Sequence, residues 1–233
     1  MWKMLVALLV GVAPVVAQEN LTAYDALRVV GDHLGRNAVN HIISVSGTEG
    51  TPQPETWRVV LESPDGRGAR EVDISHGQVV SDQPSRGIVG SAEGSKINTK
   101  KLNLDSSGAY SVASYTADKS NAHFSRVNYT LRTDERGDPV WILALQSRSG
   151  QPVGTIHIGA NRGNVTRTEG MFAGATMEDV ETDETAHEDV EEGNGPFRHT
   201  KERIRASFRR AQDGARGMFD RVRRSFVDFI NRY

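Results

Sequence analysis

Histidine is the residue type of this 233-residue chain best suited to acid–base catalysis near neutral pH or to metal binding. No two of its histidines stand in a His-x-x-x-His or His-Glu-x-x-His spacing, so the pattern that places zinc ligands on one helix face is absent from the sequence. Asp73 and His76 flank a predicted turn and could form a weak metal pair, although a solvated hairpin end fits them better. His157 stands between Ile156 and Ile158, so on a half-buried strand it should face solvent or a polar neighbouring strand. The full set is His33, His41, His76, His123, His157, His187 and His199.

The motifs of common enzyme classes are also missing from the sequence. There is no Gly-x-Ser-x-Gly nucleophile elbow, no dinucleotide-binding Gly-x-Gly-x-x-Gly after a strand and no phosphate-binding P-loop. The chain has no cysteine, which excludes thiol nucleophiles, disulfides and iron–sulfur clusters. We therefore expect no catalytic residue, no metal and no cofactor, and the remaining enzymatic alternative is a hydrolase that uses His76 or His157.

Charge is strongly segregated along the chain. The totals of 28 Lys and Arg and 30 Asp and Glu leave a net charge of −2, which argues against a chain that binds nucleic acid over its whole surface. Residues 178–194 nevertheless contain nine carboxylates and no Lys or Arg, whereas residues 198–233 contain eleven Lys and Arg and four acids, a net of +7. The sequence predicts an acidic disordered linker over residues 178–196 and a basic amphipathic helix over residues 197–233.

This basic segment is the candidate surface-binding region. Three interpretations remain open: binding to an anionic membrane or cell-envelope polymer, association with a partner helix or a second copy, and docking on the protein's own body or neutralisation by the acidic linker. Arg outnumbers Lys ten to one in the segment, and guanidinium groups suit phosphate and carboxylate recognition. The candidate residues are Arg203, Arg205, Arg209, Arg210, Arg216, Arg221, Arg223 and Arg224.

The N-terminus is typical of an export signal. Lys3 precedes an apolar run over residues 4–13, and Pro14 interrupts it. Val15 and Ala17, with small or medium-sized side chains, then stand at the −3 and −1 positions of a cleavage site near Ala17. We therefore expect residues 1–17 to be removed and the mature protein to be secreted, periplasmic or held in the cell envelope. An uncleaved membrane anchor is the alternative.

The residues between these terminal segments predict two similar units. Residues 18–82 open with a helix capped by Thr22 and continue with alternating strands, with a turn predicted at His76-Gly77. Residues 103–177 repeat the order with a helix capped by Asp105 or Ser106. Residues 83–102, rich in Gly and Ser, are expected to form a linker. The predicted fold class is α+β, with two repeated helix-plus-antiparallel-sheet units in tandem followed by the acidic linker and the C-terminal amphipathic helix.

The order of elements is a leading helix, the pattern Trp-x-Val-x-Leu, a polar turn, an apolar strand and a closing Gly-x-Val. This order resembles that of the PepSY domain, which occurs in metallopeptidase propeptides and in exported bacterial proteins. The matching segments are residues 57–61, 71–80, 139–145 and 153–165. The resemblance implies a small helix-and-sheet fold that binds or inhibits a peptidase and has no catalytic residues. The second unit departs from the pattern, since Gly159-Ala160-Asn161 replaces the usual Asp before the closing turn.

Together these patterns predict a non-enzymatic extracytoplasmic binding module that modulates or inhibits a peptidase. Its expected partner is a protein, and no nucleic acid is expected. The alternative function is an envelope-associated structural or interaction protein, tethered to an anionic surface or a partner helix by its C-terminal basic helix. The oligomeric state stays open.

Overall fold

The computed structural model describes residues 20–63, 68–85 and 95–170. Their first half holds α1 (Ala23–Leu34), a 3-10 turn η1 (Arg36–His41), β1 (Ile42–Gly50), β2 (Thr56–Glu62), β3 (Ala69–Ser75) and β4 (Gln78–Pro84). The second half holds η2 (Thr99–Lys101), α2 (Ser106–Lys119), β5 (Arg126–Thr133), β6 (Pro139–Gln146), β7 (Pro152–Gly159) and β8 (Val165–Glu169).

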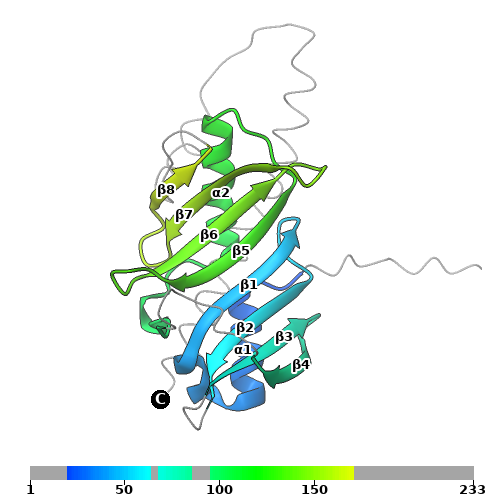
Figure 1. Ribbon diagram of the computed structural model, residues 1–233, viewed down its shortest axis with the longest axis vertical. Helices are drawn as coiled ribbons and strands as arrows, with labels where there is room; N and C mark the ends of the chain where they lie inside the picture. Colours follow the sequence, from blue (N-terminus) through cyan, green and yellow to red (C-terminus); the bar gives the residue numbers. More distant parts are fainter. Residues whose placement is uncertain (1–19, 64–67, 86–94, 171–233) are drawn as a thin grey trace, which may run out of the picture.

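All eight strands belong to one antiparallel sheet with the order β4-β3-β2-β1-β5-β6-β7-β8. The middle of the sheet is the pairing of β1 with β5, in which Val45 lies opposite Leu131. Helices α1 and α2 lie behind opposite ends of this sheet, on the same face (Figure 1). The second face of the sheet carries no helix among the described residues.

The prediction of two helix-plus-sheet units in tandem is wrong, because the strands of both expected units form a single sheet. As separate units, β1 and β5 would each end a small sheet with a row of unpaired N–H and C=O groups. Pairing these two strands with each other satisfies those groups and extends the hydrophobic face across the whole sheet.

The buried aromatic residues Trp57, Tyr129 and Trp141, on β2, β5 and β6, join the cores of the two halves of the sheet. The Trp57 and Tyr129 rings lie 5.6 Å apart, and the Tyr129 and Trp141 rings lie 6.2 Å apart, between their centroids. Trp57 donates from Nε1 to the carbonyl of Leu21 just before α1, and Trp141 donates from Nε1 to the carbonyl of Leu104 just before α2, both at 2.8 Å. The start of each helix is thereby fixed to the sheet.

Part of the segment expected to be a linker belongs to this core. Ile97 and Leu102 are buried in the main hydrophobic cluster, and the backbone N–H of Ile97 donates to the carbonyl of Ile42 at 2.7 Å. The expected signal peptide, acidic linker and basic helix lie outside the described residues.

Candidate binding groove

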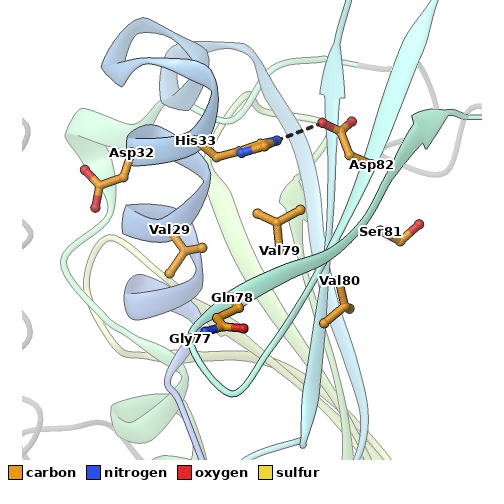
Figure 2. A pocket seen from close by; sticks show the side chains of 9 residues that line it. All are labelled: Val29, Asp32, His33, Gly77, Gln78, Val79, Val80, Ser81 and Asp82. Carbon is orange, nitrogen blue, oxygen red and sulfur yellow. Dashed lines mark hydrogen bonds and ion pairs between the residues drawn. The ribbon is translucent and has the colours of Figure 1, made fainter.

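An open groove of about 680 Å³ runs between helix α1 and edge strand β4. Figure 2 shows Val29 on the helix and Val79 on the strand, on the two walls of the groove, with His33 and Asp82 in contact at one end. The groove is lined by Val29, Asp32, His33, Gly77, Gln78, Val79, Val80, Ser81 and Asp82.

The helical wall of the groove follows from how α1 begins and which face it buries. Thr22 caps the helix by accepting a hydrogen bond from the N–H of Asp25, whose side chain accepts from the N–H of Thr22 in return. Ala26, Leu27 and Val30 are fully buried against the sheet. Val29, Asp32 and His33 follow at spacings of three and four, which places them on a neighbouring flank of the helix, beside β4.

The strand wall begins at a two-residue turn between β3 and β4. His76 and Gly77 both have positive φ angles, 50° and 77°, in the left-handed region that a tight hairpin of this type requires at both central positions. The turn brings Gln78 opposite Ser75. The sequence prediction of a turn at His76-Gly77 is confirmed.

A β-bulge at Val80 decides which side chains of β4 face the groove. Val79 lies opposite Ile74 and Ser81 lies opposite Asp73, so Val80 has no residue opposite it on β3. In a regular strand Val79 and Ser81 would share a face, but the extra residue moves Asp82 to the helix side, opposite buried Val72. The bulge is therefore what aims the Asp82 carboxylate at α1.

Asp82 joins β4 to both neighbouring elements through a charged network. Its Oδ1 accepts from Nε of Arg70 on β3, and its Oδ2 accepts from Nη2 of Arg70 at 2.6 Å and lies 3.0 Å from Nε2 of His33. The hydrogen bonds from Arg70 are the main cause that lowers the pKa of Asp82, and the contact with His33 adds to it against the opposing effect of partial burial. Asp82 is therefore ionised at neutral pH.

Two other residues give the groove its exposed character. Asp32 lies at the rim on α1, points away from β4 (Figure 2) and makes no ion pair within the described residues. Val80, in the bulge, is 61% exposed and is the only exposed large hydrophobic residue of the described part of the chain. The groove thus combines apolar side chains with a carboxylate open to solvent.

A second polar cluster, fully buried, lies where the two helices begin. Oδ1 of Asp105 accepts from the N–H of Ser106 at 2.6 Å, capping α2, and from the N–H of Tyr24 at 3.1 Å in the first turn of α1. Oγ of Ser106 accepts from the N–H of Ala23 at 3.0 Å and donates to Oε1 of Gln53 at 2.7 Å. The cluster satisfies free N–H groups of both helices and holds the helix ends together.

Burial raises the pKa of Asp105 to about 7, although hydrogen bonds from Thr22 and from the backbone of Ser106 and Tyr24 oppose the rise. The cluster borders no open groove, and its contacts are those of a structural joint. The prediction of a cap at Asp105 or Ser106 is confirmed for Asp105.

The residues that the sequence suggested for chemistry are not brought together. Asp73 accepts from Arg58 at 2.8 Å, and Nδ1 of His76 lies 2.9 Å from Oγ of Ser75, so they do not form a pair. His157 lies opposite Arg167 of β8, and partial burial, followed by the charge of Arg167, lowers its pKa. The structure groups no three His, Asp or Glu side chains as metal ligands within residues 20–63, 68–85 and 95–170.

The eight candidate arginines between Arg203 and Arg224 lie outside the described residues. The groove residues His33 and Asp82 were not singled out by sequence reasoning. They stand 49 positions apart, and their contact depends on an edge strand and a bulge that no local pattern marks.

Comparison with known proteins adds little to this geometry. No family model and no curated protein matches the chain. A solved structure with a partial likeness is described as that of a "putative lipoprotein" from Clostridium difficile 630, which is 14% identical, with 66% of this chain and 95% of that chain covered and a TM-score of 0.39. A TM-score below 0.5 does not establish a common fold, and the PepSY resemblance stays a prediction. Within the described residues, no helix is both long and apolar enough to span a membrane.

Proposed function

We propose that this protein is a non-enzymatic extracytoplasmic binding module whose groove between α1 and β4 holds a cationic, partly apolar segment of a partner polypeptide. The observation that carries the proposal is the groove itself, about 680 Å³ with Val29 and Val79 inside it and Asp32 at its rim. Its volume falls within the range of roughly 300–1,000 Å³ that is common for ligand sites.

The net charge of the half of the sheet that contains the groove supports a cationic ligand. Residues 20–63 and 68–85, which form α1 and β1 to β4, contain eight acidic residues and four Arg, a net of −4. Asp32 offers a solvent-exposed carboxylate to a ligand, while Asp82 is already engaged by Arg70 and His33. The acids are Asp25, Asp32, Glu49, Glu55, Glu62, Glu71, Asp73 and Asp82, and the bases are Arg28, Arg36, Arg58 and Arg70.

Addition of a partner strand along the β4 edge is the less favoured mode of binding. The bulge at Val80 interrupts the strand, Pro84 at its end lacks an N–H, and the Asp82 charge points inward. These features are the ones that edge strands use to avoid pairing with other chains. A ligand seated in the groove, against side chains, avoids all three obstacles.

Modulation of a peptidase is the form of partner binding that the PepSY resemblance implies, and the extracytoplasmic location rests on the export signal expected at residues 1–17. A panel of extracellular metallopeptidases tests this part of the proposal. Inhibition of, or binding to, a member of the panel by the mature chain supports it, and the absence of both rules it out.

The groove is tested with synthetic peptides and the mature full-length chain. A labelled 12-residue peptide of Arg and Leu residues is compared, by fluorescence anisotropy, with a peptide in which every Arg is Gln. We expect the Arg peptide to bind at least several-fold more tightly, and Asp32→Lys to remove most of that preference.

A matched charge reversal controls for the overall change in net charge. Glu135 lies in the exposed turn between β5 and β6 on the other half of the sheet, so Glu135→Lys should leave peptide binding unchanged. Equal losses in Asp32→Lys and Glu135→Lys would show attraction to the whole protein and contradict a site at the groove.

Attachment to an anionic surface through residues 198–233 remains the alternative function, favoured by their eleven Lys and Arg. Flotation of the full chain with vesicles of anionic lipid, at low and high salt, tests it. Binding at low salt that is lost in a variant with Arg209→Gln and Arg210→Gln supports the alternative, and no binding at either salt concentration removes it.

A further inference from the structure

The described part of the sheet is electrically polarised from one end to the other. The half with α1 and β1 to β4 has a net charge of −4, whereas residues 95–170, which form α2 and β5 to β8, contain ten Lys and Arg and six acids, a net of +4. Burial raises the pKa of one of those six, Asp105, to about 7, which makes the second half more positive still. The groove lies at the acidic end.

The C-terminal part of the sequence has the same two charges in the opposite order. Residues 178–194, with nine carboxylates, come first after β8, which is the outer strand of the basic half. Residues 198–233, with a net charge of +7, come second. If the chain turns back across the sheet, the acidic segment meets the basic half and the basic segment meets the acidic half.

The connecting chain is long enough for this path. The distance from β8 to β4 spans seven strand spacings, about 34 Å at about 4.8 Å each. The 27 residues from 171 to 197 can extend to about 90 Å at about 3.3 Å per residue. Tethering at this length also gives the segment a high effective concentration at the groove.

We propose that residues 198–233 of the same chain occupy the groove between α1 and β4 and so compete with the partner segment. This inference rests on the proposed function, because it assigns the groove its own internal ligand. Binding of a partner would then require displacement of the basic segment, and affinity would depend on ionic strength.

The apolar residues of the basic segment favour the groove over the acidic segment as its docking site. Phe208, Phe219 and Phe226 need an apolar surface, which Val29, Val79 and exposed Val80 provide at the groove. Residues 178–194 contain only Val180, Ala186 and Val190 as apolar residues among their nine carboxylates. The basic segment can be attracted by charge to the groove and to residues 178–194, but its phenylalanines find an apolar surface mainly at the groove.

Energy transfer between two dyes tests the docking in the intact mature chain, without peptide or partner. The absence of cysteine from the sequence allows clean labelling at introduced cysteines. One pair is Gln83→Cys, exposed on β4, with Ser225→Cys in the basic segment, and the comparison pair is Ser149→Cys, in the exposed turn between β6 and β7, with Ser225→Cys. We expect higher transfer for the Gln83 pair, and at least a halving of its transfer in 0.5 M NaCl, a salt concentration at which the Debye length is about 4 Å.

Asp32→Lys should lower the transfer of the Gln83 pair, and the matched Glu135→Lys should not. Equal transfer in both dye pairs, or no response to Asp32→Lys, would overturn the inference. Transfer seen only in mixtures of singly labelled chains would also overturn it, because the segment would then bind a second copy.

Failure of this inference can be told apart from failure of the proposed function. If the Arg and Leu peptide binds the groove while the dye pairs show no docking, only the internal ligand is lost. If docking is seen but the peptide fails to bind even when Arg209→Gln and Arg210→Gln weaken the segment, the proposed function fails. If both hold, the same double substitution should raise peptide affinity.

Discussion

Nε2 of His33 lies 3.0 Å from Oδ2 of Asp82, and this contact joins helix α1 to the edge strand β4 at the end of the groove. Asp82 is aimed at the helix because the bulge at Val80 shifts the alternation of the strand by one residue. Arg70 holds the same carboxylate from β3. Asp82 therefore links the edge strand β4 both to α1 and, in addition to the backbone pairing, to β3.

Substitution of Asp82 by Asn should weaken this anchor. The variant loses the charge that Arg70 pairs with, and for a partly buried ion pair with two contacts we expect a loss of about 1 kcal/mol in the free energy of unfolding at neutral pH. Urea denaturation measures the loss. Asp138→Asn, which removes an exposed partner of Lys101, is the control and should change stability much less.

The pH dependence of this loss has a defined direction. The pKa of Asp82 is lowered in the folded protein, so its stabilising contribution is present above the ordinary carboxyl pKa of 3.8 and is lost as the pH falls through the lower folded value. Wild type and Asp82→Asn should converge in acid. A stability difference that grows below pH 4 would contradict the assignment.

Asp105 should show the opposite dependence on pH. Burial raises its pKa from 3.8 to about 7, so between these values the folded protein holds a proton that the unfolded chain has lost. The free energy of unfolding therefore falls as the pH rises through this interval and is constant above it. A difference of about three pKa units corresponds to about 4 kcal/mol.

Asp105→Asn keeps the shape of the side chain and an oxygen that can accept the capping hydrogen bonds, and it removes the titrating carboxyl group. Urea denaturation of the variant and the wild type from pH 4 to pH 8 should give a stability difference that moves in favour of the variant by up to about 4 kcal/mol. A difference that is flat across this range, or that moves in favour of the wild type, would contradict a carboxyl of raised pKa at the joint.

Gly77 should resist substitution because of its backbone and not for lack of space. Its φ angle is 77°, and an added Cβ would meet nothing closer than Cδ1 of Leu21 at 3.9 Å. Gly77→Ala should lower the free energy of unfolding by about 1 kcal/mol, the cost of a left-handed conformation for a residue with a Cβ.

Gly137, with a φ angle of 79° and open space around it, is the matched control in the turn between β5 and β6. Gly137→Ala should lower stability by a similar amount, but only Gly77→Ala should also weaken peptide binding, because Gly77 lines the groove. Equal peptide affinities in the two variants would argue against a ligand seated at this turn.

Local patterns in the sequence predict several elements correctly and their assembly incorrectly. The Thr22 and Asp25 cap, the helical spacing that follows and the turn at His76-Gly77 depend on neighbouring residues, and all three are present. The pairing of β1 with β5 connects residues more than 70 positions apart, and nothing in either strand distinguishes a sheet centre from a sheet edge. Two separate sheets were therefore expected in place of one.

The groove was harder to predict for the same reason. Its walls come from α1 and β4, and Asp82 faces His33 only because Val80 is an unopposed extra residue. Alternation read from the sequence places Val79, Ser81 and Gln83 on one face of β4 and would turn Asp82 away from α1.

Hydrogen–deuterium exchange of the mature chain carrying Arg209→Gln and Arg210→Gln, which weaken the competing basic segment, is compared with and without the Arg and Leu peptide at saturating concentration. This comparison tests the central claim of a ligand groove most directly. We predict slower exchange of the amides of residues 29–34 in α1 and 78–82 in β4, and unchanged exchange in β8 at the opposite edge of the sheet. Peptide binding that leaves both groove segments unchanged, or that protects β8 equally, would contradict the account.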